Sequence, residues 1–186
     1  MISSRFVSIM FFMLSMSFLV CAVPVREGQS TTGAIERRDT GITGSLTLLE
    51  GMTRKQLDES MRITSAESAA SLLNTTTTNI RSTTGFMVKK VKINPDSPGS
   101  TDYAVRTAST MSLCVKMINI FCQKFGYDVI APYAANVDCA FAGLIRKNAE
   151  LNVNGTQTIA QKIDVKPEAL KNANLVESAK LLGFCV

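Results

Sequence analysis

The chain of 186 residues contains no histidine and no tryptophan, and aromatic residues make up only 6% of it. The absence of histidine excludes Ser-His-Asp and Cys-His catalysis, histidine-dependent ribonuclease chemistry and histidine-ligated zinc. The absence of tryptophan removes the usual aromatic platform for stacking sugars. The sequence also lacks a glycine-rich phosphate loop and a nucleophile elbow. These absences leave a pair of carboxylates as the catalytic arrangement to consider.

Carboxylate pairs that hydrolyse glycosidic bonds need two acids that converge on one site. Asp128 and Asp138 lie in the central part of the chain, and Asp58 is followed directly by Glu59. No spacing in the sequence indicates that these side chains converge, and solvation of the surface explains them as well. We therefore expect no enzymatic activity, and the sequence implies no metal and no cofactor.

The charge of the chain gives little indication of a partner. Lys and Arg total 20 against 15 Asp and Glu, so the formal net charge is +5. Because the basic residues form no stripe with interleaved aromatics, we expect no binding to nucleic acid. The densest basic cluster, Lys89, Lys90 and Lys92, lies in a segment, residues 86–93, that predicts a short strand or extended arm. Such lysines are typical of a protected sheet edge, and contact with an acidic surface is the alternative.

The amino terminus has the features of a secretory signal peptide. Residues 1–22 place one basic residue, Arg5, before an apolar run over residues 6–20, and Cys21-Ala22 completes a small-residue cleavage site. The run is short for a membrane span, which needs about 20 apolar residues, so we prefer cleavage to a membrane anchor. We expect no other segment to be long and apolar enough to cross a bilayer. We therefore expect a secreted, extracellular protein with no membrane span after signal removal.

Residues 23–52 are rich in glycine, serine and threonine and show weak periodicity. Such a composition buries too little apolar surface to offset the entropy of ordering, and it predicts a flexible pro-region or linker. The segment contains Arg37-Arg38, which resembles the dibasic sites cut by late-secretory proprotein convertases in fungi and animals. Cleavage after Arg38 and a solvated charge cluster are both compatible with this pattern.

The most periodic stretch lies between residues 102 and 145 and predicts two antiparallel helices. Gly126 is placed to end the first helix in a left-handed conformation, and Ala131-Pro132 opens the second with proline at its first position. Apolar residues recur in the first helix at alternating spacings of three and four: Ala108, Met111, Val115, Ile118, Cys122 and Phe125.

Two further helices are predicted outside this pair. One covers residues 53–74 and begins with a capping box at Thr53. The other runs from Pro167 to Gly183. The sequence therefore predicts a mainly α fold, a single disulfide-stapled bundle of three or four helices over residues 53–186, with the short β element described above.

Four cysteines remain after signal removal, an even number that suits an oxidising compartment. Cys114 and Cys122 share one predicted helix, and their spacing separates the Cα atoms by about 12 Å. A disulfide spans roughly 7 Å at most, so this pairing is excluded. We prefer Cys122–Cys139 with Cys114–Cys185, because Cys122 and Cys139 flank a turn near Asp128. The alternative is Cys114–Cys139 with Cys122–Cys185.

Two sequons match the N-glycosylation acceptor pattern, at Asn74 and at Asn154. In a secreted chain such sites indicate surface loops. The first sequon opens a threonine-rich segment, residues 74–85, which we expect to be a loop.

The layout of leader, dibasic segment and few cysteines resembles that of small secreted proteins of fungi, including candidate effectors. This resemblance implies a secreted, non-enzymatic interaction protein that acts outside the producing cell on an unknown protein partner, for example one from a host.

Two alternative functions stay open. The first is a secreted carrier that binds a lipid or other apolar ligand, because methionine-bearing helices can line adaptable cavities. The second is a structural protein of a cell wall or surface, suggested by the threonine-rich segment and the sequons. The residues expected to line a helical cavity are Met111, Val115, Ile118, Phe121, Phe125 and Phe141.

Overall fold

The structure, a computed structural model, describes residues 31–88 and 98–185, with side chains over 41–87 and 101–185. The chain divides into two units, Met1–Ala34 and Ile35–Val186. The described residues form seven helices and no strand: α2 (Thr31–Ser60), α3 (Ala66–Val88), α4 (Pro98–Phe125), α5 (Tyr127–Leu151), α6 (Gly155–Lys162), α7 (Pro167–Asn172) and α8 (Val176–Leu181). The prediction of a mainly helical fold is confirmed, whereas the expected number of three or four helices is wrong.

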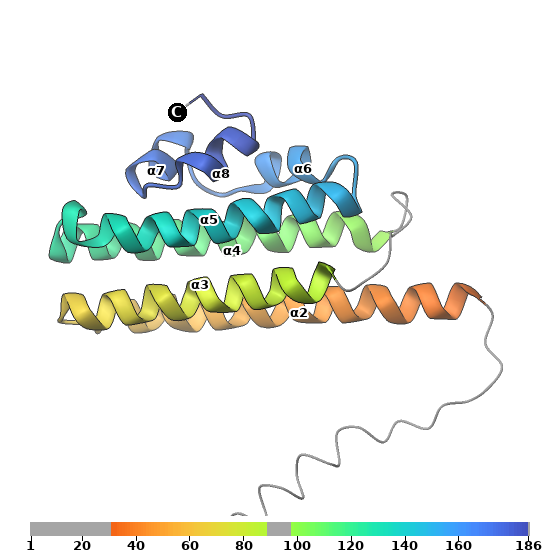
Figure 1. Cartoon of the computed structure of the whole chain (residues 1–186), viewed down its shortest axis with the longest axis horizontal. Helices are drawn as coiled ribbons and strands as arrows, with labels where there is room; N and C mark the ends of the chain where they lie inside the picture. Colours follow the sequence, from red (N-terminus) through yellow and green to blue (C-terminus); the bar gives the residue numbers. More distant parts are fainter. Residues whose placement is uncertain (1–30, 89–97, 186) are drawn as a thin grey trace, which may run out of the picture. The chain divides into compact units, whose positions relative to one another are not determined.

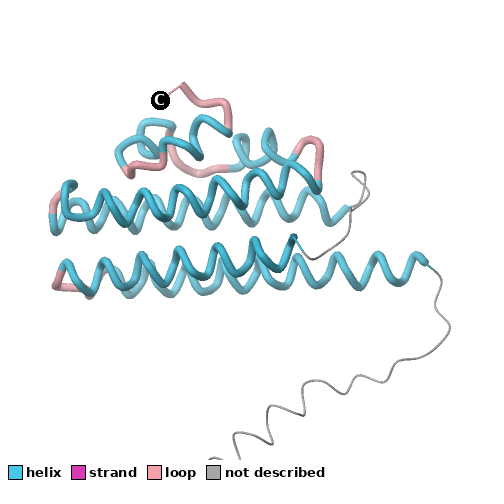
Figure 2. Tube along the Cα trace, in the orientation of Figure 1, coloured by secondary structure: helices cyan, strands magenta, loops and turns pink. Residues whose placement is uncertain are grey.

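Helices α2 to α5 form an antiparallel bundle in which each helix reverses the direction of the one before it (Figures 1 and 2). Helix α5 contacts α3, α4, α6 and α8, and α4 contacts α3, α5, α6 and α7. The three short C-terminal helices lie against α4 and α5, on the side away from α2 and α3. This arrangement leaves the outer side of the α2–α3 hairpin uncovered by other described elements.

The apolar stripe predicted for α4 is the centre of the core. Ala108, Met111, Val115 and Ile118 are fully buried, and they pack with residues of α2, α3, α5 and α7. Helix α4 ends at Phe125, and Gly126 follows it with φ 91°, in the conformation that glycine adopts most easily. Both the helix and its glycine terminator therefore agree with the prediction.

Helix α5 begins earlier than the sequence indicates. It starts at Tyr127, so Pro132 lies inside the helix and not at its first position. The missing N–H of Pro132 removes one bond of the helical ladder, the one to the carbonyl of Asp128. Burial of the α5 face, including Val137 and Phe141, offsets this loss.

The predicted helix over residues 53–74 is wrong, because a turn divides it. Helix α2 ends at Ser60 and α3 begins at Ala66. Thr53 is a mid-helix residue whose hydroxyl donates to the carbonyl of Leu49 at 2.8 Å, and not a cap. The start of α3 is capped instead by Ser65, whose Oγ accepts the N–H of Ser68 at 3.2 Å.

Lys124 holds the turn between α2 and α3 against the end of α4. Its Nζ donates to the carbonyl oxygens of Ser60, Met61 and Ile63 at 2.9, 2.8 and 3.1 Å. These carbonyls lie at and just after the C-terminal end of α2, where no N–H group of the helix is available to them and a positive charge is favoured. One side chain thereby satisfies three backbone groups and joins two helical pairs.

The flexible segment expected over residues 23–52 is wrong for the part that the structure describes. Residues from Thr31 onward belong to α2, and Ile42, Leu46 and Leu49 have no exposed surface. Their spacing of four and three places them on one helical face. The polar residues around them weaken the apolar periodicity of the sequence. The dibasic pair Arg37-Arg38 lies within α2. The predicted signal peptide, residues 1–22, lies outside the described residues.

The threonine-rich segment predicted as a loop forms the middle of α3. Threonine is accommodated there because its hydroxyl donates to the carbonyl four residues earlier, as from Thr76 to Leu72 and from Thr77 to Leu73, both at 2.9 Å. The predicted β element over residues 86–93 is not seen, since its described part, up to Val88, ends α3. Lys89, Lys90 and Lys92 lie outside the described residues.

The predicted C-terminal helix is two helices. It starts at Pro167 and ends before Gly183, which has φ 81°, as expected. However, Asn174 adopts φ 58° and breaks the run between α7 and α8. Asparagine tolerates this left-handed conformation better than most residues, and its amide donates to the carbonyl of Ala131 at 3.1 Å.

The preferred disulfide pairing does not form, because Cys122 and Cys139 lie at unequal distances from the α4–α5 turn, which is at Gly126. Cys122 precedes Gly126 by four residues and Cys139 follows it by thirteen. This difference offsets the two cysteines by about 13 Å along the helices, beyond the reach of a disulfide. All four cysteines in the described residues are unpaired. The bundle is therefore held by packing and hydrogen bonds in this structure, and the expected disulfide staples are absent.

The four cysteines differ in exposure. Cys114 has no exposed surface and belongs to the core, whereas Cys139 and Cys185 are exposed. Burial raises the pKa of the Cys114 thiol far above its ordinary value, and it raises that of Cys122 as well. Since the thiolate is the reactive form, Cys114 is shielded from disulfide exchange.

Helix α5 is also the one helix in the described residues that is long and apolar enough to cross a membrane. The expectation that no segment after the leader meets these criteria is therefore wrong. Half of its most apolar window is buried inside the protein. Contacts with four other helices account for this apolar composition.

Candidate functional site

Several charged side chains inside the bundle join one helix to another. Glu50 on α2 accepts hydrogen bonds from Arg106 and Ser109 on α4, at 3.4 and 2.9 Å. Arg106 also pairs with Asp102 at 2.9 Å. These groups are partly buried and satisfy one another, so their arrangement is explained by the fold.

Asp138, considered above as one of a pair of catalytic acids, caps α8. Its two carboxylate oxygens accept the backbone N–H groups of Glu177 and Ser178, both at 2.8 Å. The N-terminus of a helix favours such a negative charge. Asp128 is exposed at the start of α5 and takes no part in this contact. The structure therefore shows a docking role for Asp138.

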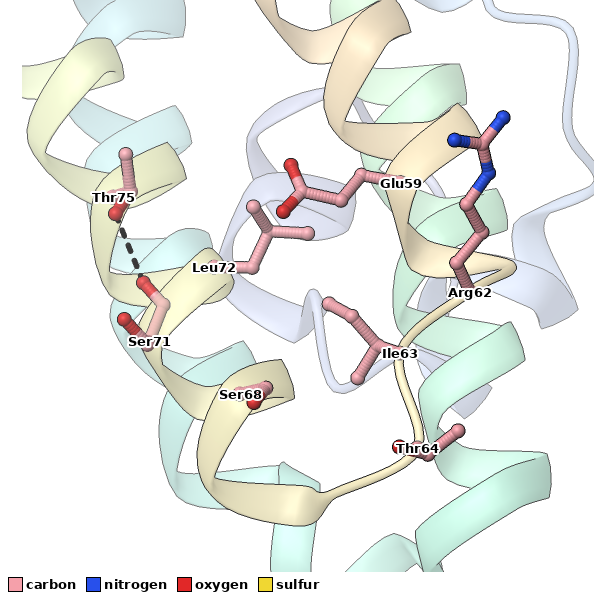
Figure 3. Close-up of a pocket in the computed structure, with 8 residues that line it drawn as sticks. All are labelled: Glu59, Arg62, Ile63, Thr64, Ser68, Ser71, Leu72 and Thr75. Atoms are coloured by element: carbon pink, nitrogen blue, oxygen red, sulfur yellow. Dashed lines mark hydrogen bonds between the residues drawn. The ribbon is translucent and has the colours of Figure 1, made fainter.

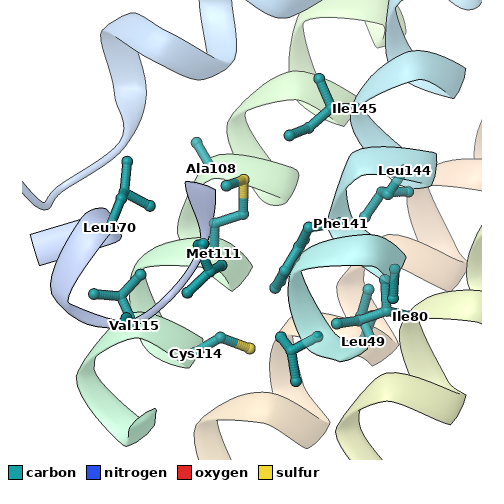
Figure 4. Close-up of a cluster of buried hydrophobic side chains, with 14 of the residues drawn as sticks. Leu49, Ile80, Ala108, Met111, Cys114, Val115, Phe141, Leu144, Ile145 and Leu170 are labelled. Carbon is teal, nitrogen blue, oxygen red and sulfur yellow. The ribbon is translucent and has the colours of Figure 1, made fainter. Parts of the chain in front are cut away.

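The six residues expected to line a helical cavity form packed core. Met111, Val115, Ile118, Phe121 and Phe141 are fully buried, and Phe125 packs against them. Figure 4 shows Phe141 facing Met111 and Cys114 across the interior, with Leu49 and Ile80 closing the cluster from α2 and α3. None of the six lines any of the three surface grooves described next.

A first groove, called here the hairpin groove, has a volume of about 670 Å³ and lies between the end of α2 and the start of α3. In Figure 3 the side chains of Ile63 and Leu72 lie between the two helices, and Glu59 extends over them. Thr75 and Ser71 are joined by a hydrogen bond along α3. Its lining is mainly polar: Glu59, Arg62, Ile63, Thr64, Ser68, Ser71, Leu72 and Thr75.

A second groove, called here the Tyr133 groove, has a volume of about 540 Å³ and lies between α3 and α5. It shares Ser71 and Thr75 with the hairpin groove, so the two grooves adjoin along α3. Most of the residues that line it are polar and come from α3, their methyl and methylene groups give the exposed lining an apolar share, and α5 contributes one aromatic ring: Glu67, Ala70, Ser71, Asn74, Thr75, Thr78, Asn79 and Tyr133.

A third, smaller groove of about 300 Å³ brings together basic residues from three elements: Arg54 on α2, Lys116 on α4 and Lys162 on α6. Arg54 pairs with Glu50 at 3.2 Å, and Lys116 pairs with Asp164 at 3.1 Å. Two of the three charges are therefore balanced by acids, which weakens the attraction for an anion.

The two predicted glycosylation sites differ in their surroundings. Asn154 is exposed in the turn before α6, as expected for a surface loop. Asn74 is exposed on α3, but Thr76 of the same sequon is fully buried, and its hydroxyl donates to Gln56 at 3.0 Å. The expectation that both sequons lie in loops is therefore wrong for Asn74.

The part of the chain that the structure describes holds no group of three or more cysteine or acidic side chains able to bind a metal ion. The prediction of a loop for the threonine-rich segment, residues 74–85, gave no indication of the grooves on α3. The spacing of Thr76 and Thr83 among the apolar residues of this segment indicates a buried helical face. No protein-family model and no curated protein matches the chain.

Proposed function

We propose that this chain is a secreted, non-enzymatic interaction protein that acts outside the producing cell, and that it binds its partner through the outer face of α3. The observation that carries the proposal is the pair of adjoining grooves on that helix, which share Ser71 and Thr75. Their volumes lie in the range of ligand-binding clefts. The hairpin groove is formed by α2 and α3, and the Tyr133 groove by α3 and α5.

The distribution of charged groups supports binding over catalysis. Asp138, Glu50 and Lys124 each satisfy contacts between helices, and the sequence supplies no histidine to act as a base near pH 7. The carrier alternative has less support, because the six residues proposed for its cavity are occupied with packing against one another.

Association with a cell wall or surface remains a second candidate. It is favoured by the hydroxyl and amide lining of the Tyr133 groove, since such groups both donate and accept hydrogen bonds, as wall polymers do.

Expression of the full chain in yeast tests the export on which the proposal depends. We expect the protein in the medium with Val23 at its amino terminus, or Asp39 if the dibasic site is cut, because residues 1–22 have the form of a cleaved leader. Mass spectrometry of the secreted protein measures the terminus.

The control for export is Leu14→Arg, which places a charge in the apolar run of the leader and should keep the chain inside the cell. The proposal fails if the unaltered chain stays in the cell with residues 1–22 attached, or if Leu14→Arg leaves export unchanged.

A further inference from the structure

We propose that the Tyr133 groove binds a neutral oligosaccharide, with the Tyr133 ring against the face of one sugar and the α3 side chains on its hydroxyl groups. This inference deepens the proposed function and rests on it, because it names the chemical class of the partner. The groove supplies an aromatic ring, two amides and one carboxylate within about 540 Å³.

The polar groups of the Tyr133 groove are available to a ligand. The side chains of Glu67, Asn74 and Asn79 make no hydrogen bond to another described residue. Each amide offers two N–H donors and a carbonyl acceptor, and the carboxylate offers acceptors only. A sugar ring carries hydroxyl groups that donate and accept at close spacing, so the lining matches a polyhydroxylated ligand.

The two threonines of the groove contribute methyl groups and lone pairs. Thr75 donates its hydroxyl proton to the carbonyl of Ser71, and Thr78 donates to that of Asn74, both at 3.0 Å. Their remaining lone pairs accept from a ligand, while their methyl groups present an apolar surface. This combination suits the alternating C–H and O–H edges of a sugar.

Tyr133 provides the stacking surface that the tryptophan-free sequence otherwise lacks. Its side chain comes from α5, is half-buried and packs partly against the core. A ring held in this way loses little conformational freedom when a ligand binds. Its exposed part is the one aromatic surface in the groove lining.

The charges of the two adjoining grooves argue against an anionic ligand. Glu67 is the one charged residue lining the Tyr133 groove, and in the hairpin groove Glu59 is matched by Arg62. The combined lining therefore carries no excess of positive charge to attract phosphate, sulfate or uronate groups. An amphipathic helix is also a poor fit, because it needs a continuous row of apolar contacts.

Isothermal titration with defined hexasaccharides tests the inference. Laminarihexaose and N-acetylchitohexaose represent fungal walls, cellohexaose and xylohexaose represent plant walls, and oligogalacturonate is the anionic probe. The protein is purified from medium or cells, whichever contains it, and the fraction that carries no glycan at Asn74 is used, because Asn74 lines the groove and enzymatic release of a glycan would turn its amide into a carboxylate. We expect at least one neutral hexasaccharide to bind with a Kd below about 5 mM, and the one that binds identifies the source.

Two variants locate the site. Tyr133→Ala and Asn79→Ala should each weaken binding about tenfold or more. Tyr127→Ala removes an exposed ring from the same helix outside the groove and should leave binding unchanged. Circular dichroism confirms that each variant is folded, and Asn79→Ala still tests the site if loss of Tyr133 disturbs the core.

Absence of binding by all four neutral probes overturns the inference, as does binding of oligogalacturonate alone, or binding that both groove variants retain. A protein that is exported but binds no neutral probe would leave the proposed function intact. Retention of the protein inside the cell would contradict the proposed function whatever the titration shows. Failure of the proposed function and failure of the oligosaccharide inference can therefore be told apart.

Discussion

Replacing Leu46 with alanine should lower the free energy of unfolding by about 2–5 kcal/mol. Leu46 has no exposed surface and packs in the core with Ile42 and Leu49 on α2. Removal of its branched end leaves a cavity that a bundle of packed helices closes only in part. Urea denaturation followed by circular dichroism measures the change.

Leu48→Ala is the matched control, because Leu48 lies two residues away on α2 with 68% of its surface exposed. Its replacement should change the free energy of unfolding by less than about 0.5 kcal/mol. Equal effects of the two substitutions would show that this part of α2 is not packed as described.

Replacing Asp138 with alanine should destabilise the protein by about 2–4 kcal/mol, because two backbone N–H groups at the start of α8 lose their acceptor. Ser178 and Ala179 are buried, so the unpaired N–H of Ser178 is not readily hydrated. Asp138→Asn keeps one carbonyl acceptor and should have an intermediate effect. Urea denaturation of the unaltered protein, Asp138→Ala and Asp138→Asn measures the three free energies of unfolding.

The control for Asp138 is Asp128→Ala, which removes an exposed acid from the first turn of the same helix. We expect a loss below about 1 kcal/mol, from the interaction of Asp128 with the helix dipole. A loss at Asp138 as small as that at Asp128 would contradict the capping of α8.

The sequence predicted α4 correctly because its buried positions are occupied by apolar residues. Met111, Val115 and Ile118 follow the helical repeat directly, and Gly126 marks the end. The C-terminal region was predicted in part, since Pro167 and Gly183 mark its limits. The break at Asn174 depends on packing against α5 and leaves a weak local signal.

The full lengths of α2 and α3 were not predicted, because polar residues occupy half of the core positions of α2 and a third of those named below for α3. The buried residues of α2 alternate spacings of four and three, as in a bundle seam: Ile42, Leu46, Leu49, Thr53, Gln56 and Ser60. In α3 one row of buried residues follows the same rule, with Ala70 and Thr77 buried beside it: Ala69, Leu73, Thr76, Ile80, Thr83 and Met87. The apolar residues alone show only a weak helical periodicity in both helices. The polar residues belong to the same buried faces, since Thr76 on α3 donates a hydrogen bond to Gln56 on α2.

The grooves on α3 could not be derived from the sequence for a related reason. Asn74, Thr75 and Thr78 are separated from Tyr133 by more than fifty residues of chain, and only the pairing of α3 with α5 brings them together. The disulfide prediction failed because Cys122 and Cys139 are four and thirteen residues from the turn at Gly126, and so lie at different heights along the two helices.

The most direct test is hydrogen exchange of the whole native chain, measured by mass spectrometry. It shows whether the partly polar buried face of α2, from Ile42 to Ser60, belongs to the bundle. Amides from Ile42 to Ser60 should exchange about as slowly as those from Val137 to Leu144 on α5, because both segments are buried in the same core and open together. Exchange of residues 42–52 at the rate of an unstructured chain, with α5 protected, would contradict the structure described for α2.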